Sequence, residues 1–113
     1  MGIKEIYFKR KKYFENYLKH SQQIKKLAKE FFKEKFLKMF VFGSVVRGDY
    51  SIGLSDIDIA IILKKGVHRD EKVRFLLLID EKFPENPFEI HIVSEEKWKS
   101  WYAKFVKENF IEV

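Results

Sequence analysis

Residues 43–48 read Gly-Ser-Val-Val-Arg-Gly, a pattern that could hold a phosphate chain. A strand that ends in Gly43-Ser44 before a helical turn presents backbone N–H groups and a hydroxyl to an anion, and the glycine leaves room for a close phosphate. Arg47 either binds phosphate as well or pairs with a nearby acid such as Asp49, and both alternatives stay open. The stretch therefore predicts a cradle for a triphosphate.

Six residues later, Ser55-Asp56-Ile57-Asp58 supplies two carboxylates that could bind a metal ion. Asp56 and Asp58 are two positions apart on an expected strand, so their side chains leave the same face and can share Mg²⁺. Without a cation their mutual repulsion would raise the pKa of at least one carboxyl. With two ions, one would activate the attacking oxygen and the other would stabilise a leaving pyrophosphate. The alternative, two structural charges, fits poorly because Asp58 stands in an otherwise apolar strand.

Together, the pattern Gly-Ser-x-x-Arg-Gly followed by Ser-Asp-x-Asp resembles the signature of the DNA polymerase β-like nucleotidyltransferase superfamily. Its short single-domain members, the minimal nucleotidyltransferases, are the most similar. The resemblance implies that Gly43 and Ser44 bind the β- and γ-phosphates of a nucleoside triphosphate and that Asp56 and Asp58 bind two Mg²⁺ ions. It further implies transfer of NMP to an acceptor hydroxyl, with AMP from ATP as the expected group.

The same resemblance implies a third carboxylate, usually Asp, on a later strand. This sequence has no Asp there, and Glu89 is the candidate for this third metal ligand and catalytic residue. A glutamate is one methylene longer than an aspartate, which changes the geometry of the metal site. His91 lies on the same strand face and is a secondary candidate. The structural alternatives are a solvated strand face for Glu89 and a packed or hydrogen-bonded histidine for His91.

The spacing of apolar residues predicts the elements that must position these side chains. The long first helix could be divided in two, with Ser21 as the cap of the second part. Residues 56–63 are apolar on both faces at their far end, which predicts a central strand in a sheet covered on two sides. The fold class expected from the element order is α/β (α+β), a small mixed β-sheet with helices packed against it, as in the nucleotidyltransferase fold. Strands are expected over residues 36–42, 56–63 and 88–93, and helices over residues 9–35, 45–48, 69–83 and after Ser94.

Length and composition limit the function classes that remain. The chain has 113 residues, 46% of them hydrophobic, and no cysteine. We therefore expect a single nucleotidyltransferase domain over residues 1–113 and exclude disulfides, thiolate metal sites and cysteine nucleophiles. No uninterrupted apolar run approaches the length of a membrane span, and no signal or anchor is recognisable. A cytoplasmic protein that does not bind membranes is expected.

The net charge of +6 invites a nucleic-acid interpretation, but its distribution weakens that interpretation. Residues 1–38 hold 12 basic and 4 acidic residues, a net of +8, whereas residues 39–113 hold 11 basic and 13 acidic residues, a net of −2. The motif-bearing part is thus the acidic part, as suits a site that attracts Mg²⁺. RNA binding through Lys25, Lys26 and Lys29 is the minority alternative to a solvated helix face.

The sequence also bears on partners. A chain of this length is too short to include an acceptor-binding domain, so another molecule is expected to supply the acceptor. The resemblance implies a small all-helical HEPN protein in this role, with the present chain as the antitoxin of a toxin–antitoxin pair that adds AMP to a tyrosine of the toxin. The alternative function is a nucleotide-binding or partner-neutralising module whose catalysis has decayed along with the third Asp.

Overall fold

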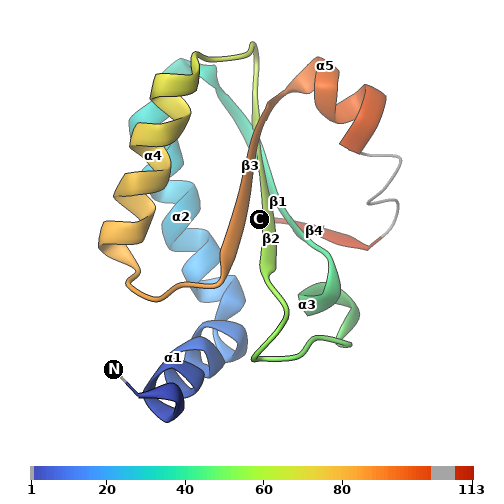
Figure 1. The fold of residues 1–113 in the computed structure, drawn as a ribbon. Coiled ribbons are helices and arrows are strands. Elements are labelled where there is room, and N and C mark those ends of the chain that lie inside the picture. Colours follow the sequence, from blue (N-terminus) through green and yellow to red (C-terminus); the bar gives the residue numbers. More distant parts are fainter. Residues whose placement is uncertain (1, 103–108) are drawn as a thin grey trace.

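Four strands form one mixed sheet in the order β3-β2-β1-β4 (Figure 1). The structure, a computed structural model, describes residues 2–102 and 109–113. In the sheet, β2 pairs with β3 in parallel and with β1 in antiparallel orientation, and β4 is antiparallel to the other side of β1. The strands are β1 (Phe36–Phe42), β2 (Ile57–Leu63), β3 (Phe88–Ser94) and β4 (Phe110–Glu112).

Helices cover both faces of this sheet. Figure 1 shows α1, α2 and α4 on one side and α5 on the other, while the single turn α3 lies beside the lower end of the sheet. A 3₁₀ turn (Lys33–Lys35) follows α2, and a π-helical turn (Trp98–Tyr102) continues α5. The α-helices are α1 (Ile3–Glu15), α2 (Tyr17–Phe32), α3 (Ser44–Arg47), α4 (Arg69–Lys82) and α5 (Glu95–Lys97). None of the helices in the described residues is long and apolar enough to cross a membrane.

The two faces of the sheet carry separate hydrophobic clusters, because successive side chains of a strand point to opposite faces. Ile59 and Ile61 of β2 pack with Phe75 of α4 in the cluster under the long helices. The other cluster is smaller, and there Phe40 and Trp98 stack with their ring centroids 5.0 Å apart. Since β2 is buried on both faces, it is the central strand that the sequence predicts. The mixed sheet with helices packed against it is likewise confirmed.

The first helical region is divided at a different residue from the expected one. The break between α1 and α2 falls at Asn16, whose side-chain amide donates a hydrogen bond to the carbonyl of Lys12 at 2.9 Å. Ser21 lies inside α2, where it is fully buried and its hydroxyl donates to the carbonyl of Tyr17 at 2.6 Å. A serine satisfied by its own helix in this way needs no cap position, so the expected break at Ser21 is wrong.

The sequence interpretation missed β4. Its three residues pair with the second half of β1, and Val41 faces Ile111. The backbone N–H of Val113 donates to the carbonyl of Met39, and Lys25 donates to the carbonyl of Val113 at 2.7 Å. Three residues are too few to display strand alternation, so β4 is identified by its pairing with β1 and not by a pattern in the sequence.

Candidate metal and phosphate site

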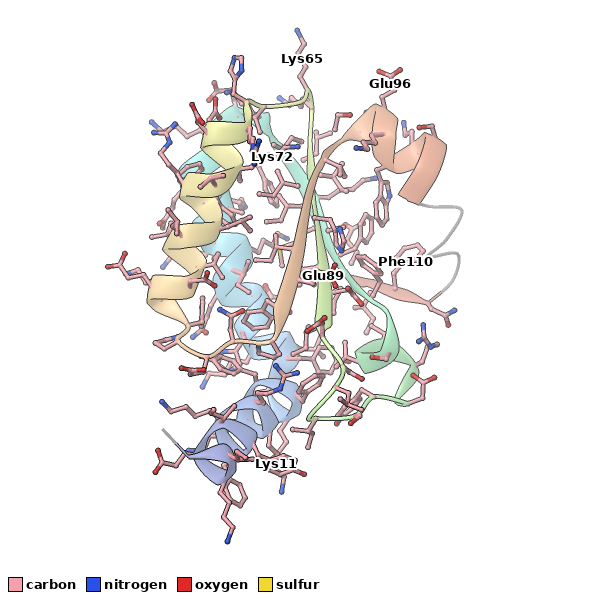
Figure 2. All side chains as sticks on the ribbon, viewed as in Figure 1. Lys11, Lys65, Lys72, Glu89, Glu96 and Phe110 are labelled. Carbon is pink, nitrogen blue, oxygen red and sulfur yellow. The ribbon has the colours of Figure 1, made fainter. Side chains whose placement is uncertain are left out.

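The parallel pairing of β2 and β3 brings two of the predicted carboxylates together. Asp58 faces Glu89 in this register, and Phe42 is the partner of Asp58 on β1. The Asp58 side chain is 23% exposed, whereas that of Glu89 is 55% exposed. Figure 2 shows Glu89 in the lower half of the sheet, away from Lys65 at the upper end. Two acids far apart in the sequence thus become neighbours at the end where β2 and β3 begin.

His91 joins this pair. Its Nε2 lies 3.8 Å from Oδ1 of Asp58 and 3.9 Å from Oε1 of Glu89. Asp58, Glu89 and His91 each offer one ligand atom, and these atoms lie within 4.8 Å of one another. Asp56 stands one residue before β2 with an exposed side chain, outside this group of three. The structure therefore brings Asp58 together with Glu89 and His91, whereas Asp56 lies outside this group.

Gly43 packs directly against Asp58. Its φ of +84° is a left-handed conformation that favours glycine. A β-carbon built at residue 43 would overlap the Asp58 carboxylate, with Oδ2 as its nearest neighbour and Cγ at 3.3 Å. The sequence pattern assigns this glycine to phosphate binding. The structure adds a second reason for glycine, because the chain must pass the carboxylate at the end of β1.

Ser44 begins the one-turn helix α3 immediately after that glycine, one residue earlier than expected. The N–H groups of Val46 and Arg47 donate to the carbonyl of Gly43 at 3.1 and 3.2 Å, and Gly48 donates to the carbonyl of Ser44 at 2.9 Å. The turn holds Gly43 and Ser44 at its N-terminal end, next to Asp58. This places the predicted phosphate cradle beside the acidic group.

Arg47 forms an ion pair with Asp49, with 3.3 Å between Nε and Oδ2. Of the two alternatives for Arg47, the structure shows this one. The arginine and aspartate side chains are 45% and 64% exposed, and an exposed pair of this kind contributes only about 0–1 kcal/mol. A phosphate could exchange with Asp49 at little cost, so a role for Arg47 in phosphate binding stays a prediction.

Arg10 of α1 holds the loop that leads into Asp56. Its guanidinium donates to the carbonyl of Ile52 at 2.7 Å and to the carbonyl of Ser55. Within this loop, the backbone N–H of Ser51 donates to the hydroxyl of Ser55. Sequence reasoning missed this contact because nothing local links Arg10 to residues more than forty positions away. The position of Asp56 therefore depends on the first helix.

Replacing Arg10 by methionine is expected to lower the free energy of unfolding by about 2 kcal/mol, because hydrogen bonds from a charged donor are worth about 1.5–3 kcal/mol and the aliphatic stem is retained. Urea denaturation of both proteins measures the change. Lys11→Met is the matched control, since Lys11 is exposed and forms an exposed ion pair with Glu15 on its own helix. A loss for Arg10→Met no larger than that for Lys11→Met would show that the loop is held by other contacts.

The pKa of Glu89 is raised above its ordinary value. Burial is the first cause and the negative charge of Asp58 the second, while His91 acts in the opposite direction and Asp56 adds a smaller rise. Because the Glu89 side chain is more than half exposed, water screens part of these effects. The folded protein therefore binds a proton at Glu89 more readily than the unfolded chain does.

The raised pKa predicts a pH dependence of stability when no metal is bound. The contribution of Glu89 is most favourable below the ordinary glutamate pKa of 4.5 and is lost as the pH rises through the raised value. In EDTA, Glu89→Gln is therefore expected to be more stable than the wild type at pH 7, with a difference that shrinks towards pH 4. Chemical denaturation at several pH values measures it. A difference that does not vary with pH would contradict the raised pKa.

Comparison with known proteins agrees with the fold. The sequence profile of the nucleotidyltransferase domain matches residues 21–112. A crystal structure of a candidate nucleotidyltransferase is similar to this chain with a TM-score of 0.63 and 38% identity, and the match covers 83% of this chain and 97% of the other. A second candidate nucleotidyltransferase, from Sulfolobus solfataricus, has a TM-score of 0.45 and 23% identity over 84% of this chain and 83% of the other. No curated protein matches the sequence.

Proposed function

Because this chain belongs to the nucleotidyltransferase domain family, we propose that it transfers AMP from ATP to an acceptor hydroxyl with Mg²⁺ as the metal cofactor. The observation that carries the proposal is the meeting of Asp58, Glu89 and the Gly43-Ser44 turn at one end of the sheet. Family membership supports nucleotidyl transfer in general. The choice of ATP, of Mg²⁺ and of the acceptor is the proposal.

The residues at this end of the sheet fit a divalent cation. Two carboxylates from adjacent strands are hard oxygen ligands of the kind that Mg²⁺ prefers, and it usually takes one or two of them together with substrate phosphates. The close packing of Gly43 against Asp58 keeps the carboxylate next to the predicted phosphate cradle. We assign Asp58 and Glu89 as ligands and Asp56 as a further ligand from the margin. When bound, Mg²⁺ would polarise the transferred phosphate and stabilise the charge on the pyrophosphate that leaves.

The turn after β1 would bind the phosphate chain of ATP. Gly43 and Ser44 stand at the N-terminal end of α3, where backbone N–H groups and the serine hydroxyl can donate to phosphate oxygens. The β- and γ-phosphates would lie there, which brings the α-phosphate towards Asp58. Arg47 would exchange its exposed partner Asp49 for a phosphate oxygen. These side chains thus position the donor for attack by the acceptor hydroxyl.

The acceptor we propose is a tyrosine hydroxyl of a small helical HEPN protein, as in a toxin–antitoxin pair. The similarity to minimal nucleotidyltransferases supports this partner. The exposure of Glu89 supports it too, since an acceptor hydroxyl must reach the acidic group from outside. The hydroxyl loses its proton to solvent as its oxygen forms a bond to the α-phosphorus. The bond between the α-phosphorus and the bridging oxygen breaks, and that oxygen leaves with pyrophosphate.

Label transfer tests the reaction. The protein and Mg²⁺ are incubated with the proposed acceptor, taken as the product of the gene adjacent to its own. One reaction contains ATP labelled on the α-phosphate, and a parallel reaction contains ATP labelled on the γ-phosphate. We expect the acceptor to gain the α-label and the mass of AMP, whereas the γ-label leaves in pyrophosphate. EDTA should stop both the transfer of the α-label to the acceptor and the release of γ-labelled pyrophosphate. Labelling of the acceptor by γ-labelled ATP, or no transfer with any of the four triphosphates, would refute the proposed function.

A second candidate function, RNA binding, is favoured by three hollows with lysines in their linings, formed by residues of α1, α2 and the end of α4. A hollow of about 460 Å³ and one of about 360 Å³ share Lys82 and Phe83, and the smaller shares Lys26 with a third hollow of about 440 Å³. The first hollow also contains Tyr13 and His20, rings on which a base could stack. We call these three adjoining hollows the lysine groove; their lysines are Lys9, Lys12, Lys25, Lys26, Lys29 and Lys82, and the acidic Glu30 lines two of them.

Salt dependence tests the lysine groove. Binding of a single-stranded RNA should weaken steeply between 50 and 200 mM salt if several phosphates are contacted. Changing Lys25, Lys26 and Lys29 to glutamine should lower the affinity and reduce the salt slope by about 2 to 3. Glutamine at the exposed lysines 64, 65 and 97 is the matched control with the same change of charge. Affinity that is independent of salt, or an equal loss in both variants, would exclude the groove.

A further inference from the structure

His91 stands at a distance from both carboxylates that suits a shared metal ion better than direct hydrogen bonds. Its Nε2 is 3.8 Å from Asp58 and 3.9 Å from Glu89, whereas an N–H···O hydrogen bond spans about 2.7–3.2 Å. Two ligand atoms that each lie about 2.1 Å from one ion can be at most about 4.2 Å apart. Both separations fall below this limit, so small side-chain rotations suffice to bring nitrogen and oxygen onto one ion.

The fold also holds the imidazole ring in this place. His91 faces Ala60 in the β2–β3 register, and the fully buried methyl group of Ala60 leaves room for the ring. The ring of Phe42 lies on another side, with centroids 5.6 Å apart and an angle of 41° between the planes. The His91 side chain is 23% exposed, as is that of Asp58. The imidazole is therefore positioned by its neighbours rather than extended into solvent.

A nitrogen ligand changes which cation a site prefers. Carboxylate and water sites suit Mg²⁺ and Mn²⁺, whereas imidazole suits Fe²⁺, Ni²⁺, Cu²⁺ and Zn²⁺, and affinities for first-row divalent ions are lowest for Mn²⁺ and higher for Co²⁺ and Zn²⁺. We propose that His91 binds the same ion as Asp58 and Glu89 and shifts the preference of the site from Mg²⁺ towards the later transition metals, Zn²⁺ among them. The inference rests on the proposed function only for the assignment of these residues to a metal. It adds a nitrogen ligand to a site that the sequence motif, Gly43-Ser44 with Asp56 and Asp58, builds from oxygen ligands and phosphate donors.

The competing explanation is that His91 serves the carboxylates as a charge partner and touches no metal. In that case its replacement would disturb the binding of every divalent cation in the same proportion. A ligand, by contrast, affects nitrogen-preferring ions more than Mg²⁺ and leaves a spectroscopic signature. These two consequences separate the alternatives.

Pulsed electron paramagnetic resonance of bound Mn²⁺ detects a nitrogen ligand directly. We expect the wild type to show hyperfine coupling from an imidazole nitrogen. Labelling histidine with ¹⁵N should replace this signal by the ¹⁵N coupling. The coupling should vanish in His91→Gln. It should persist in His68→Gln, the matched control, because His68 is exposed and lies at the start of α4 without a side-chain capping bond. Mn²⁺ bound without nitrogen coupling, or no Mn²⁺ binding at all, would overturn the inference.

Metal titrations supply the second readout. His91→Gln should weaken Zn²⁺ binding about tenfold or more and Mg²⁺ binding about threefold or less, since imidazole suits Zn²⁺ whereas Mg²⁺ prefers oxygen ligands. His91→Asp restores a ligand atom but makes it oxygen, so its affinity for Mg²⁺ relative to Zn²⁺ should exceed that of the wild type. Circular dichroism identifies any variant that has unfolded. Equal losses for both ions in folded His91→Gln would contradict the inference.

The outcomes for this inference and for the proposed function are separable. AMP transfer without nitrogen coupling overturns the inference and leaves the proposed function intact. Nitrogen coupling together with the altered ion preference supports the inference even when no acceptor gains AMP, which counts against the proposed function alone.

Discussion

Asp58→Asn is expected to reduce AMP transfer by about 10³-fold while the protein stays folded. A metal ion stabilises the transition-state charge by several kcal/mol, and each 1.4 kcal/mol corresponds to a factor of ten in rate. Asparagine has nearly the same shape as aspartate but carries no charge, so it is a poor ligand for Mg²⁺. The measurement is the rate of α-label transfer at saturating ATP, followed by the same assay at tenfold higher Mg²⁺.

Asp58→Asn should not lower the stability of the fold, although it lowers AMP transfer. In EDTA the wild type holds Asp58 next to Glu89, and their like charges repel. Removing one charge should leave stability unchanged or increase it, which urea denaturation measures. Asp70→Asn is the matched control, because Asp70 is an exposed residue in the first turn of α4. Transfer by Asp58→Asn within tenfold of the Asp70→Asn rate would show that Asp58 does not bind the reacting metal.

Gly43→Ala is expected to reduce AMP transfer by about 10²-fold or more and to lower the free energy of unfolding by about 1–3 kcal/mol. The backbone penalty follows from the φ of +84°, which non-glycine residues adopt only with strain. The loss of transfer follows from the added methyl group, which must displace the Asp58 carboxylate. A displacement of about 1 Å at a reacting centre can cost about 10²-fold in rate.

Gly48→Ala separates the two effects. Gly48 has almost the same φ, +85°, but a β-carbon there would meet nothing within 4 Å. Both variants should therefore lose stability, whereas only Gly43→Ala should lose metal affinity and transfer by a large factor. Mn²⁺ titration with label transfer on the two proteins measures the contrast. Equal loss of transfer in both would mean that the turn itself, rather than its contact with Asp58, controls the site.

Local patterns in the sequence were sufficient for the elements that carry the site. An apolar run before Gly43 predicts β1, the isoleucines around Asp58 predict the central strand, and alternation around Glu89 predicts β3. These strands are buried on at least one face, so the apolar residues of that face form a recognisable pattern in the sequence. The neighbouring positions of Asp58 and Glu89 then follow once β2 and β3 are paired in parallel.

What the sequence did not reveal depends on contacts between distant segments. Arg10 reaches the loop before Asp56, and β4 pairs with β1, without any local pattern that announces either contact. The packing of Gly43 on Asp58 is likewise a product of the β1–β2 register, in which Phe42 faces Asp58. Asp56 was expected on the strand beside Asp58, but β2 begins only at Ile57, whose N–H donates to the carbonyl of Pro87.

The position of β4 at the far side of β1 has a consequence for the order of folding. Val41 and Ile111 are about seventy residues apart, so closing this pair costs more chain entropy than pairing β1 with β2. The Gly43 turn and the three side chains of the acidic group all come from the stretch that ends with β3. The strands that carry the site are therefore expected to pair first during folding, and β4 joins a sheet that already exists.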